Sequence, residues 1–209
     1  MGRIETLRPS WAKKLLDHVP AKALAAIREP WAPTPAMRKG TAVDEAVFSD
    51  RPLSREFPEL LPAVAASKAA LAKVLKWHSA TGEYQTRLTW ECNGVPCSGT
   101  PDAIAVSTDG SKRIIDLKTC ASATDDAIER SFRNYHYALQ LAAYTEAVGA
   151  VGPAYIVWQE TCAPYLARVS VITPEAIDRG MRDWHRAVNI WKRCCESGEW
   201  PGYDTHEML

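Results

Sequence analysis

An apolar strand with charged residues at its centre constrains this chain more than any other feature. Residues 113–119 read RIIDLKT, and the two adjacent isoleucines predict a strand that is buried in a sheet. Alternate side chains of a strand share a face, so Asp116 and Lys118 point the same way and Leu117 points to the other side. Charged groups are costly inside a sheet unless they are paired or used. We therefore expect Asp116 and Lys118 to belong to a functional site, the plain alternative being an ion pair on a solvated face.

The turn before this strand decides which residue faces Asp116. If Thr108-Asp109-Gly110 forms a three-residue loop with its glycine left-handed, Asp102 lies directly opposite Asp116 on the neighbouring strand. Opposed Cβ atoms are about 4.5–5.5 Å apart, and two carboxylates so close repel each other unless a divalent cation lies between them. Oxygen ligands of this kind suit Mg²⁺ or Mn²⁺. A two-residue turn at Asp109-Gly110 would instead pair Asp102 with Leu117 and put the two acids on opposite faces.

The order of helical and strand-like patterns predicts an α/β (α+β) fold, with a central mixed, mostly antiparallel sheet flanked by helices. Asn93-Gly94 predicts a tight hairpin, and the strands around it would form an antiparallel meander. We expect one domain over residues 1–209, in which residues 1–34 are a helical extension. The expected helices are 10–16, 21–28, 35–48, 60–78, 123–133, 135–148 and one from Thr173 to about Gly198; the expected strands are 84–92, 101–107, 113–119, 154–159 and 166–172.

Composition excludes several classes of protein. Apolar residues make up 46% and charged residues 24%, which is typical of a soluble globular protein, and no apolar run approaches the ~18 residues that cross a membrane. Because 25 Lys and Arg balance 25 Asp and Glu, the chain is not a polycation that coats nucleic acid. The amino terminus lacks the apolar core of a secretion signal, and six cysteines form no C-x-x-C pair. We therefore expect a cytoplasmic protein with free thiols and no membrane partner.

The charged strand also belongs to a recognisable pattern. Gly99-Thr100-Pro101-Asp102, followed after thirteen residues by Asp116-Leu117-Lys118, resembles the PD-(D/E)XK nuclease signature, with Asp in place of the commoner Glu. Gln140-Leu141-Ala142-Ala143-Tyr144 is similar to the Q-x-x-x-Y helix motif of the RecB-like and phage exonuclease branches. Lys39-Gly40-Thr41-Ala42-Val43-Asp44 resembles the early helix of RecE-type exonucleases, where a glycine precedes a metal-binding acid or histidine.

Together with the carboxy-terminal segment SGEWPGY (197–203), these motifs resemble the RecE-like and lambda-exonuclease-like phage recombination exonucleases over residues 35–203. The resemblance implies a restriction-endonuclease-like core. It also implies one or two Mg²⁺ (or Mn²⁺) ions, bound by Asp102, Asp116, the Leu117 carbonyl and Asp44. RecE itself is similar but carries histidine at the last of these positions, and Glu45 is the substitute if the helix is rotated.

The resemblance assigns roles to the remaining residues. Lys118 would orient the attacking water or stabilise developing charge. Gln140 and Tyr144, one turn apart on a helix, would contact the phosphate backbone or hold the lysine, although packing residues can have this spacing too. Apart from the resemblance, the basic residues of the first third of the chain predict a DNA track, with a solvated face as the alternative: Arg28, Arg38, Lys39, Arg51 and Arg55.

By resemblance, the protein would be a Mg²⁺-dependent nuclease that digests linear double-stranded DNA from the 5′ end. The remaining 3′ single strand would be loaded with a single-strand annealing protein during recombination, and the enzyme would be a ring-shaped homo-oligomer, a trimer or tetramer. Two alternatives stay open. One is a structure-specific or restriction-like endonuclease on the same core, and the other is a non-catalytic DNA-binding module with a decayed nuclease core.

Overall fold

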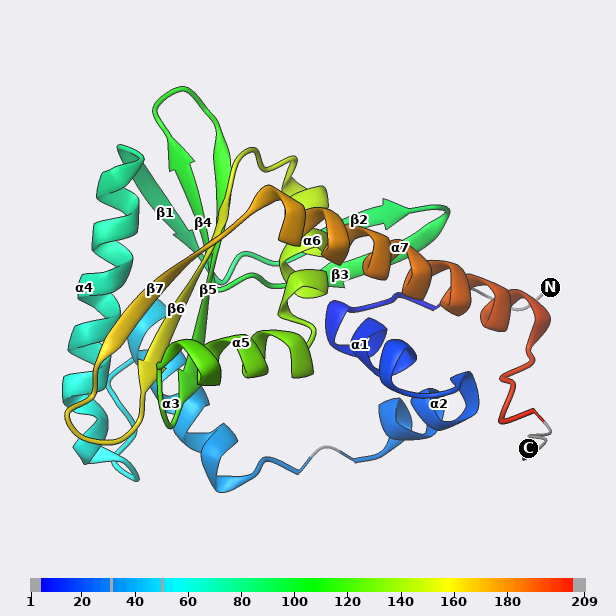
Figure 1. Cartoon of the computed structure of the whole chain (residues 1–209), viewed down its shortest axis with the longest axis horizontal. Coiled ribbons are helices and arrows are strands. Elements are labelled where there is room, and N and C mark those ends of the chain that lie inside the picture. The colour runs from blue at the N-terminus through cyan, green and yellow to red at the C-terminus, as the bar shows by residue number, and fades with distance from the viewer. Residues whose placement is uncertain (1–4, 31, 50, 205–209) are drawn as a thin grey trace.

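The computed structural model describes residues 5–30, 32–49 and 51–204, and Figure 1 shows how its elements are arranged. The predicted helices and most predicted strands occur close to the expected bounds. The helices are α1 (Pro9–Asp17), α2 (Pro20–Arg28), α3 (Pro35–Phe48), the 3-10 turn η1 (Pro58–Leu60), α4 (Leu61–Trp77), α5 (Asp125–Asn134), α6 (Tyr137–Val148) and α7 (Pro174–Ser197). The strands are β1 (Ala80–Tyr84), β2 (Leu88–Cys92), β3 (Val95–Gly99), β4 (Ala103–Ser107), β5 (Lys112–Cys120), β6 (Ala154–Glu160) and β7 (Ala167–Ile172).

A five-stranded sheet with the order β1-β4-β5-β6-β7 forms the centre of the fold. Only the β5–β6 pair is parallel, and the other neighbours are antiparallel. The expected mixed, mostly antiparallel sheet is therefore confirmed. No helix within the described residues is long and apolar enough to cross a lipid bilayer.

Helices cover both faces of this sheet, with α4 on one side and α5 and α6 on the other (Figure 1). Side chains of β5 alternate between the two layers. Ile115 and Leu117 pack into the cluster that contains α3 and α4, whereas Ile114 packs into the cluster that contains α6. Asp116 shares the second face and is only 2% exposed. A carboxylate is thus buried in the middle of the sheet, as the strand pattern predicted.

The turn between β4 and β5 is the three-residue loop, and the register that follows from it is confirmed. Gly110 has a φ of 80°, and the backbone N–H of Ser107 donates to the carbonyl of Ser111 at 2.9 Å. Ala103 therefore pairs with Ile115. One residue further along, the same register brings Asp102 opposite Asp116.

Two expectations about local structure were wrong. The strands before β4 do not form one meander, because residues 80–84 are already a strand and pair with β4, while β2 and β3 form a separate two-stranded sheet. The chain turns between β1 and β2 at Gln85, which has a φ of 49° and whose N–H donates to the carbonyl of Asp102 at 3.1 Å. Likewise, α6 begins at Tyr137 rather than at residue 135, because His136 is left-handed with a φ of 47°.

The amino-terminal segment packs against the β2–β3 hairpin and against α7. The N–H of Leu7 donates to the carbonyl of Pro96 at 2.8 Å, and the N–H of Ser98 donates to the carbonyl of Leu7 at 3.0 Å, so this segment extends the β2–β3 hairpin. In the following helix, Trp11 lies against Trp191 of α7 with ring centroids 5.7 Å apart. These contacts fix α1 beside α6 and α7 (Figure 1).

Candidate active site

Two carboxylates meet where β4 begins and β5 passes through the middle of the sheet. Asp102 lies just before β4, and its Oδ2 accepts a hydrogen bond from the backbone N–H of Leu117 at 2.7 Å. Asp116 is ion-paired with Lys118, whose Nζ also donates to the carbonyl of Leu117 at 3.3 Å. The strand therefore presents a carboxylate, a backbone carbonyl and an ammonium group side by side.

A third carboxylate reaches the same place from α3. Asp44 and Asp102 line one cavity of about 350 Å³, together with Leu117, Lys118 and other residues of α3, β5 and α6. The amide of Gln85 donates to Asp44 Oδ2 at 3.2 Å. The neighbouring Glu45 instead forms an exposed ion pair with Arg51 at 3.5 Å. The helix is therefore rotated so that Asp44, and not Glu45, faces the strand acids.

The absence of a side chain at Gly40 allows α3 to approach β5. A Cβ atom at this position would lie 2.8 Å from Oγ1 of Thr119, which is shorter than real Cβ contacts. Asp44 follows one helical turn later on the same face. The glycine that precedes the acid in the sequence motif thus has a physical role in bringing the acid to the sheet.

Burial and neighbouring charges shift the pKa of Asp44, Asp102 and Lys118. Burial, together with the charge of Asp116, raises the pKa of Asp44 to about 6 despite the attraction of Lys118. Burial and the neighbouring Asp116 also raise the pKa of Asp102 well above its ordinary value. Burial alone would lower the pKa of Lys118, but the attraction of Asp116 and Asp102 raises it, so this residue stays charged.

The donor set fits a hard divalent cation. Asp44 and Asp102 in the cavity, the neighbouring Asp116 and the Leu117 carbonyl supply only oxygen ligands, which is the chemistry that Mg²⁺ and Mn²⁺ prefer. The oxygens of the three acids do not all lie within 4.8 Å of one another. Burial and the charge of Asp116 raise the pKa of both Asp44 and Asp102, and a bound cation would favour their charged forms. Asp44, Asp102, Asp116 and Leu117 are therefore the residues that could hold the metal.

The two residues of the helix motif line up along one face of α6. The amide nitrogen of Gln140 donates to Oδ1 of Asp116 at 3.1 Å, so it contacts the acid rather than Lys118. The hydroxyl of Tyr144 donates to the carbonyl of Thr100 at 3.3 Å and supports the loop that leads into Asp102. Both side chains therefore act on the geometry of the strand acids.

Comparison with known proteins decides the family. The sequence model of a family described as a PDDEXK-like domain of unknown function (DUF3799) matches residues 72–207. The chain belongs to this family. It has the PDDEXK-like nuclease fold, and the resemblance inferred from its motifs is confirmed at this level. None of the curated proteins matches the sequence.

Solved exonuclease structures share this PDDEXK-like fold at low sequence identity. A provisionally assigned exonuclease from Eubacterium rectale superposes with a TM-score of 0.64 at 17% identity, covering 97% of this chain and 91% of the other. The alkaline exonuclease LHK-Exo from Laribacter hongkongensis, in complex with dAMP, superposes with a TM-score of 0.50 at 12% identity, covering 93% and 91%. At such identities the likeness establishes the fold.

The basic residues that we expected along a DNA track are not gathered at the acids. Arg38 and Lys39 form surface ion pairs with Glu56 and Glu59 at 3.2 and 3.5 Å. Arg28 is exposed at the end of α2, beside a shallow cavity that contains none of the acids. A role for these three residues in binding DNA stays a prediction.

Sequence reasoning missed two residues that lie at the PDDEXK-like site. Lys13 of α1 donates to Oε1 of Gln140 at 2.6 Å, and the ring of Tyr137 lies under the ammonium groups of Lys13 and Lys118, at 4.9 and 5.2 Å. Tyr137 could have been found, because it precedes Gln140 by three residues and so shares its helix face. No local pattern marks Lys13, which reaches the site only through the tertiary packing of α1.

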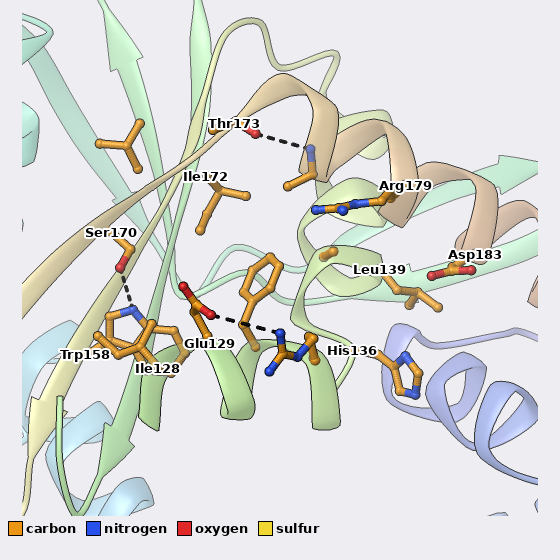
Figure 2. Close-up of a pocket in the computed structure, with 15 residues that line it drawn as sticks. Ile128, Glu129, His136, Leu139, Trp158, Ser170, Ile172, Thr173, Arg179 and Asp183 are labelled. Atoms are coloured by element: carbon orange, nitrogen blue, oxygen red, sulfur yellow. Dashed lines mark hydrogen bonds and ion pairs between the residues drawn. The ribbon is translucent and has the colours of Figure 1, made fainter. Parts of the chain in front are cut away.

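A larger cavity of about 620 Å³ lies elsewhere, between α5, α6, β7 and the start of α7 (Figure 2). Apolar side chains such as Ile128 and Ile172 line it, and Trp158 donates to Ser170 there at 2.9 Å. None of the predicted site residues contributes to this cavity. We therefore place the candidate active site in the smaller cavity, because it contains the acids, although the other cavity is larger.

One further group of metal-ligand residue types joins β2, α6 and α7. The ligand atoms of Cys92, Glu146 and His185 lie within 4.8 Å of one another. The two oxygens of Glu146 already accept hydrogen bonds from Trp184 at 3.1 Å and from His185 at 2.6 Å. We therefore interpret the group as a hydrogen-bonded junction between the three elements.

Proposed function

We propose that this member of the PDDEXK-like family is a Mg²⁺-dependent exodeoxyribonuclease (with Mn²⁺ as a substitute) that hydrolyses linear double-stranded DNA. The single observation that carries the proposal is that Asp44 and Asp102 line one open cavity of a nuclease fold together with the charged Lys118, whose buried partner Asp116 lies directly behind it. The intact set argues against a decayed, non-catalytic module.

Each residue has a task in phosphodiester hydrolysis. One or two bound ions would polarise the scissile phosphate and make a water nucleophilic at neutral pH. Asp44, Asp102, Asp116 and the Leu117 carbonyl would hold them. Lys118 is a compact charge that remains protonated, so it would stabilise negative charge on the attacking or leaving oxygen. Gln140 would keep Asp116 in its orientation.

The finer features of the reaction follow the exonucleases that share the fold. LHK-Exo was solved with a mononucleotide, dAMP, which supports stepwise removal of nucleotides from an end. We propose 5′→3′ polarity, with a 3′ single-stranded tail as the product and a single-strand annealing protein as the partner that receives it. Recombination of phage or bacterial DNA in the cytoplasm is the setting that this activity fits.

The decisive experiment is digestion of a linear duplex in which either the 5′ or the 3′ end is labelled, with and without Mg²⁺. We expect Mg²⁺-dependent release of mononucleotides, with early loss of the 5′ label. Asp116→Ala and Lys118→Ala should each lower kcat by about 10²–10³-fold, because Lys118 would stabilise negative charge in the transition state and Asp116 would hold the ion that does the same. Glu45→Ala is the matched control, since Glu45 pairs with Arg51 on the surface, and it should keep full activity.

Other results would point elsewhere. Cutting of closed circular duplex at a comparable rate would identify an endonuclease on the same core. Absence of Mg²⁺-dependent hydrolysis in the unmodified protein, or full activity in both site variants, would reject the enzyme proposal. Early loss of the 3′ label would reverse the polarity and leave the rest intact.

A further inference from the structure

Lys13 enters the PDDEXK-like site from a helix that precedes the matched family region. That match begins at residue 72, whereas Lys13 lies on α1. The helix is held by Ala12 and Leu15, which are 0% and 4% exposed. Its packing therefore delivers one basic side chain to the amide oxygen of Gln140.

The hydrogen bond of Lys13 fixes which way the Gln140 amide points. A charged lysine offers only donors, and Asp116 and Asp17 favour the charged form of Lys13. The amide oxygen therefore faces it, and Oε1 lies 2.6 Å from Nζ. The amide NH₂ then faces Asp116 and donates to Oδ1 at 3.1 Å. The reverse orientation would set the amide oxygen against a carboxylate and the NH₂ against an ammonium group.

The surroundings of Lys13 make this contact specific. Charged and titratable groups face it from three elements: Asp17 on its own helix, Asp116 and Lys118 on β5, and Tyr137 on α6. Burial, and then the charge of Lys118, lower the pKa of Lys13 to about 7. A basic side chain held at such a cost of desolvation indicates a defined task at this position.

We propose that Lys13 is a positioning residue of the active site, which orients the Gln140 amide so that Gln140 holds Asp116 in the geometry that binds metal and orders Lys118. This inference rests on the proposed nuclease function. The chain of contacts runs from Lys13 to Gln140 and from Gln140 to Asp116, so the lysine acts through its neighbour and does not touch the reacting atoms.

The test is steady-state kinetics of the full chain on linear duplex DNA, with Mg²⁺ titrated. Lys13→Met should lower kcat about tenfold and raise the Mg²⁺ concentration for half-maximal rate about tenfold, as for other groups that orient metal ligands. The KM for DNA should change by less than about twofold, because no phosphate contact is lost. Lys14→Met is the matched control, since Lys14 makes no side-chain hydrogen bond or ion pair with any residue that the structure describes.

A double-mutant cycle separates positioning from an independent contribution. If Lys13 acts through Gln140, Lys13→Met should add less than about twofold to the loss caused by Gln140→Met. If Lys13→Met does not fold, as judged by circular dichroism and thermal melting, Lys13→Arg replaces it. The guanidinium group of that variant keeps a donor toward Gln140, and we expect the variant to retain most of the rate and of the Mg²⁺ dependence.

Three results with the methionine variants would overturn the inference while leaving the nuclease intact. They are an unchanged kcat and Mg²⁺ dependence in Lys13→Met, losses that multiply fully in the double variant, and a loss confined to KM. An inactive unmodified protein is a different outcome, since it would reject the proposed function and this inference with it. A folded Lys13→Arg variant as impaired as Asp116→Ala would also contradict the positioning role.

Discussion

At the scale of single residues, the distance between Gly40 and Thr119 sets how closely α3 approaches β5. A Cβ on residue 40 would lie 2.8 Å from Thr119 Oγ1, while the Cβ of Thr119 would lie at an ordinary 4.0 Å. A side chain at residue 40 would therefore clash with the hydroxyl group of Thr119. Because Asp44 lies one turn beyond Gly40, any displacement of the helix moves this acid away from Asp102.

Gly40→Ala should therefore lower the nuclease rate about tenfold, because displacements of reacting groups by a fraction of an ångström to 1 Å cost one to two orders of magnitude. The measurement is the initial rate of nucleotide release at saturating Mg²⁺. Thr119→Ala removes the conflicting hydroxyl, so the double variant Gly40→Ala/Thr119→Ala should recover most of the rate of Thr119→Ala alone. A double variant as slow as Gly40→Ala would show that the hydroxyl is not the cause.

At the scale of elements, Glu146 joins three parts of the fold. Its carboxylate on α6 accepts from Trp184 and His185 of α7 and lies beside Cys92 of β2. Partial burial alone would raise the pKa of Glu146, but the hydrogen bonds from His185 and Trp184 hold it below the ordinary value. The charged form of Glu146 is thus favoured by folding.

This shift predicts the direction of a pH effect on stability. A carboxyl whose pKa is lower when folded stabilises the protein above its unfolded pKa, and the contribution is lost as pH falls through the folded pKa. Glu146→Gln should therefore lower the free energy of unfolding by about 1–2 kcal/mol at pH 7. In urea denaturation, the difference in the free energy of unfolding between the variant and the unmodified protein should shrink as pH falls from about 5 to below about 4. This range lies around the ordinary pKa of Glu.

Glu129→Gln is the matched control for this prediction. Within the part of the chain that the structure describes, the only ion pair of Glu129 is an exposed one with Arg133 at 4.0 Å, so the substitution should change the free energy of unfolding by less than about 0.5 kcal/mol. An equal loss in both variants, or a loss from Glu146→Gln that does not depend on pH, would contradict the role given to the junction.

Elements with strong local signals could be predicted from the sequence, and those defined by distant contacts could not. Thr34-Pro35 marks the start of α3, and the loop with Gly110 fixes the register that opposes Asp102 and Asp116. In contrast, residues 80–84 carry a weak strand pattern and are a strand because β4 lies beside them. The β2–β3 hairpin leaves the main sheet because its Trp90 packs on Trp184 of α7.

At the scale of the whole molecule, the site combines residues that are far apart in the sequence, from Lys13 to Tyr144. Asp102, Asp116 and Lys118 could be predicted because one hairpin contains them. Lys13 could not, because its role depends on how α1 is fixed against the hairpin and α7, which only the folded chain defines. The sequence also left Asp44 and Glu45 as alternatives, and the rotation of α3 separates them.

The balanced charge of the chain bears on how it would stay on DNA. The chain has 25 basic and 25 acidic residues, and Arg38 and Lys39 are paired with acids. The electrostatic attraction between a single copy and a DNA duplex is therefore expected to be weak. A protein that holds DNA by six to ten phosphate contacts loses roughly 10³–10⁵-fold in affinity between 50 and 200 mM salt. Enclosure of the duplex by a ring would not depend on salt in this way.

We therefore expect a homotrimer or homotetramer that surrounds DNA. Sedimentation at micromolar concentration should show one of these species, with and without a linear duplex. In a single-turnover digestion with a heparin trap, the number of nucleotides removed per binding event should change less than about threefold between 50 and 200 mM salt, even though association slows. A strict monomer under both conditions, or processivity that collapses with salt, would mean that this nuclease holds its substrate by surface charge instead of enclosure.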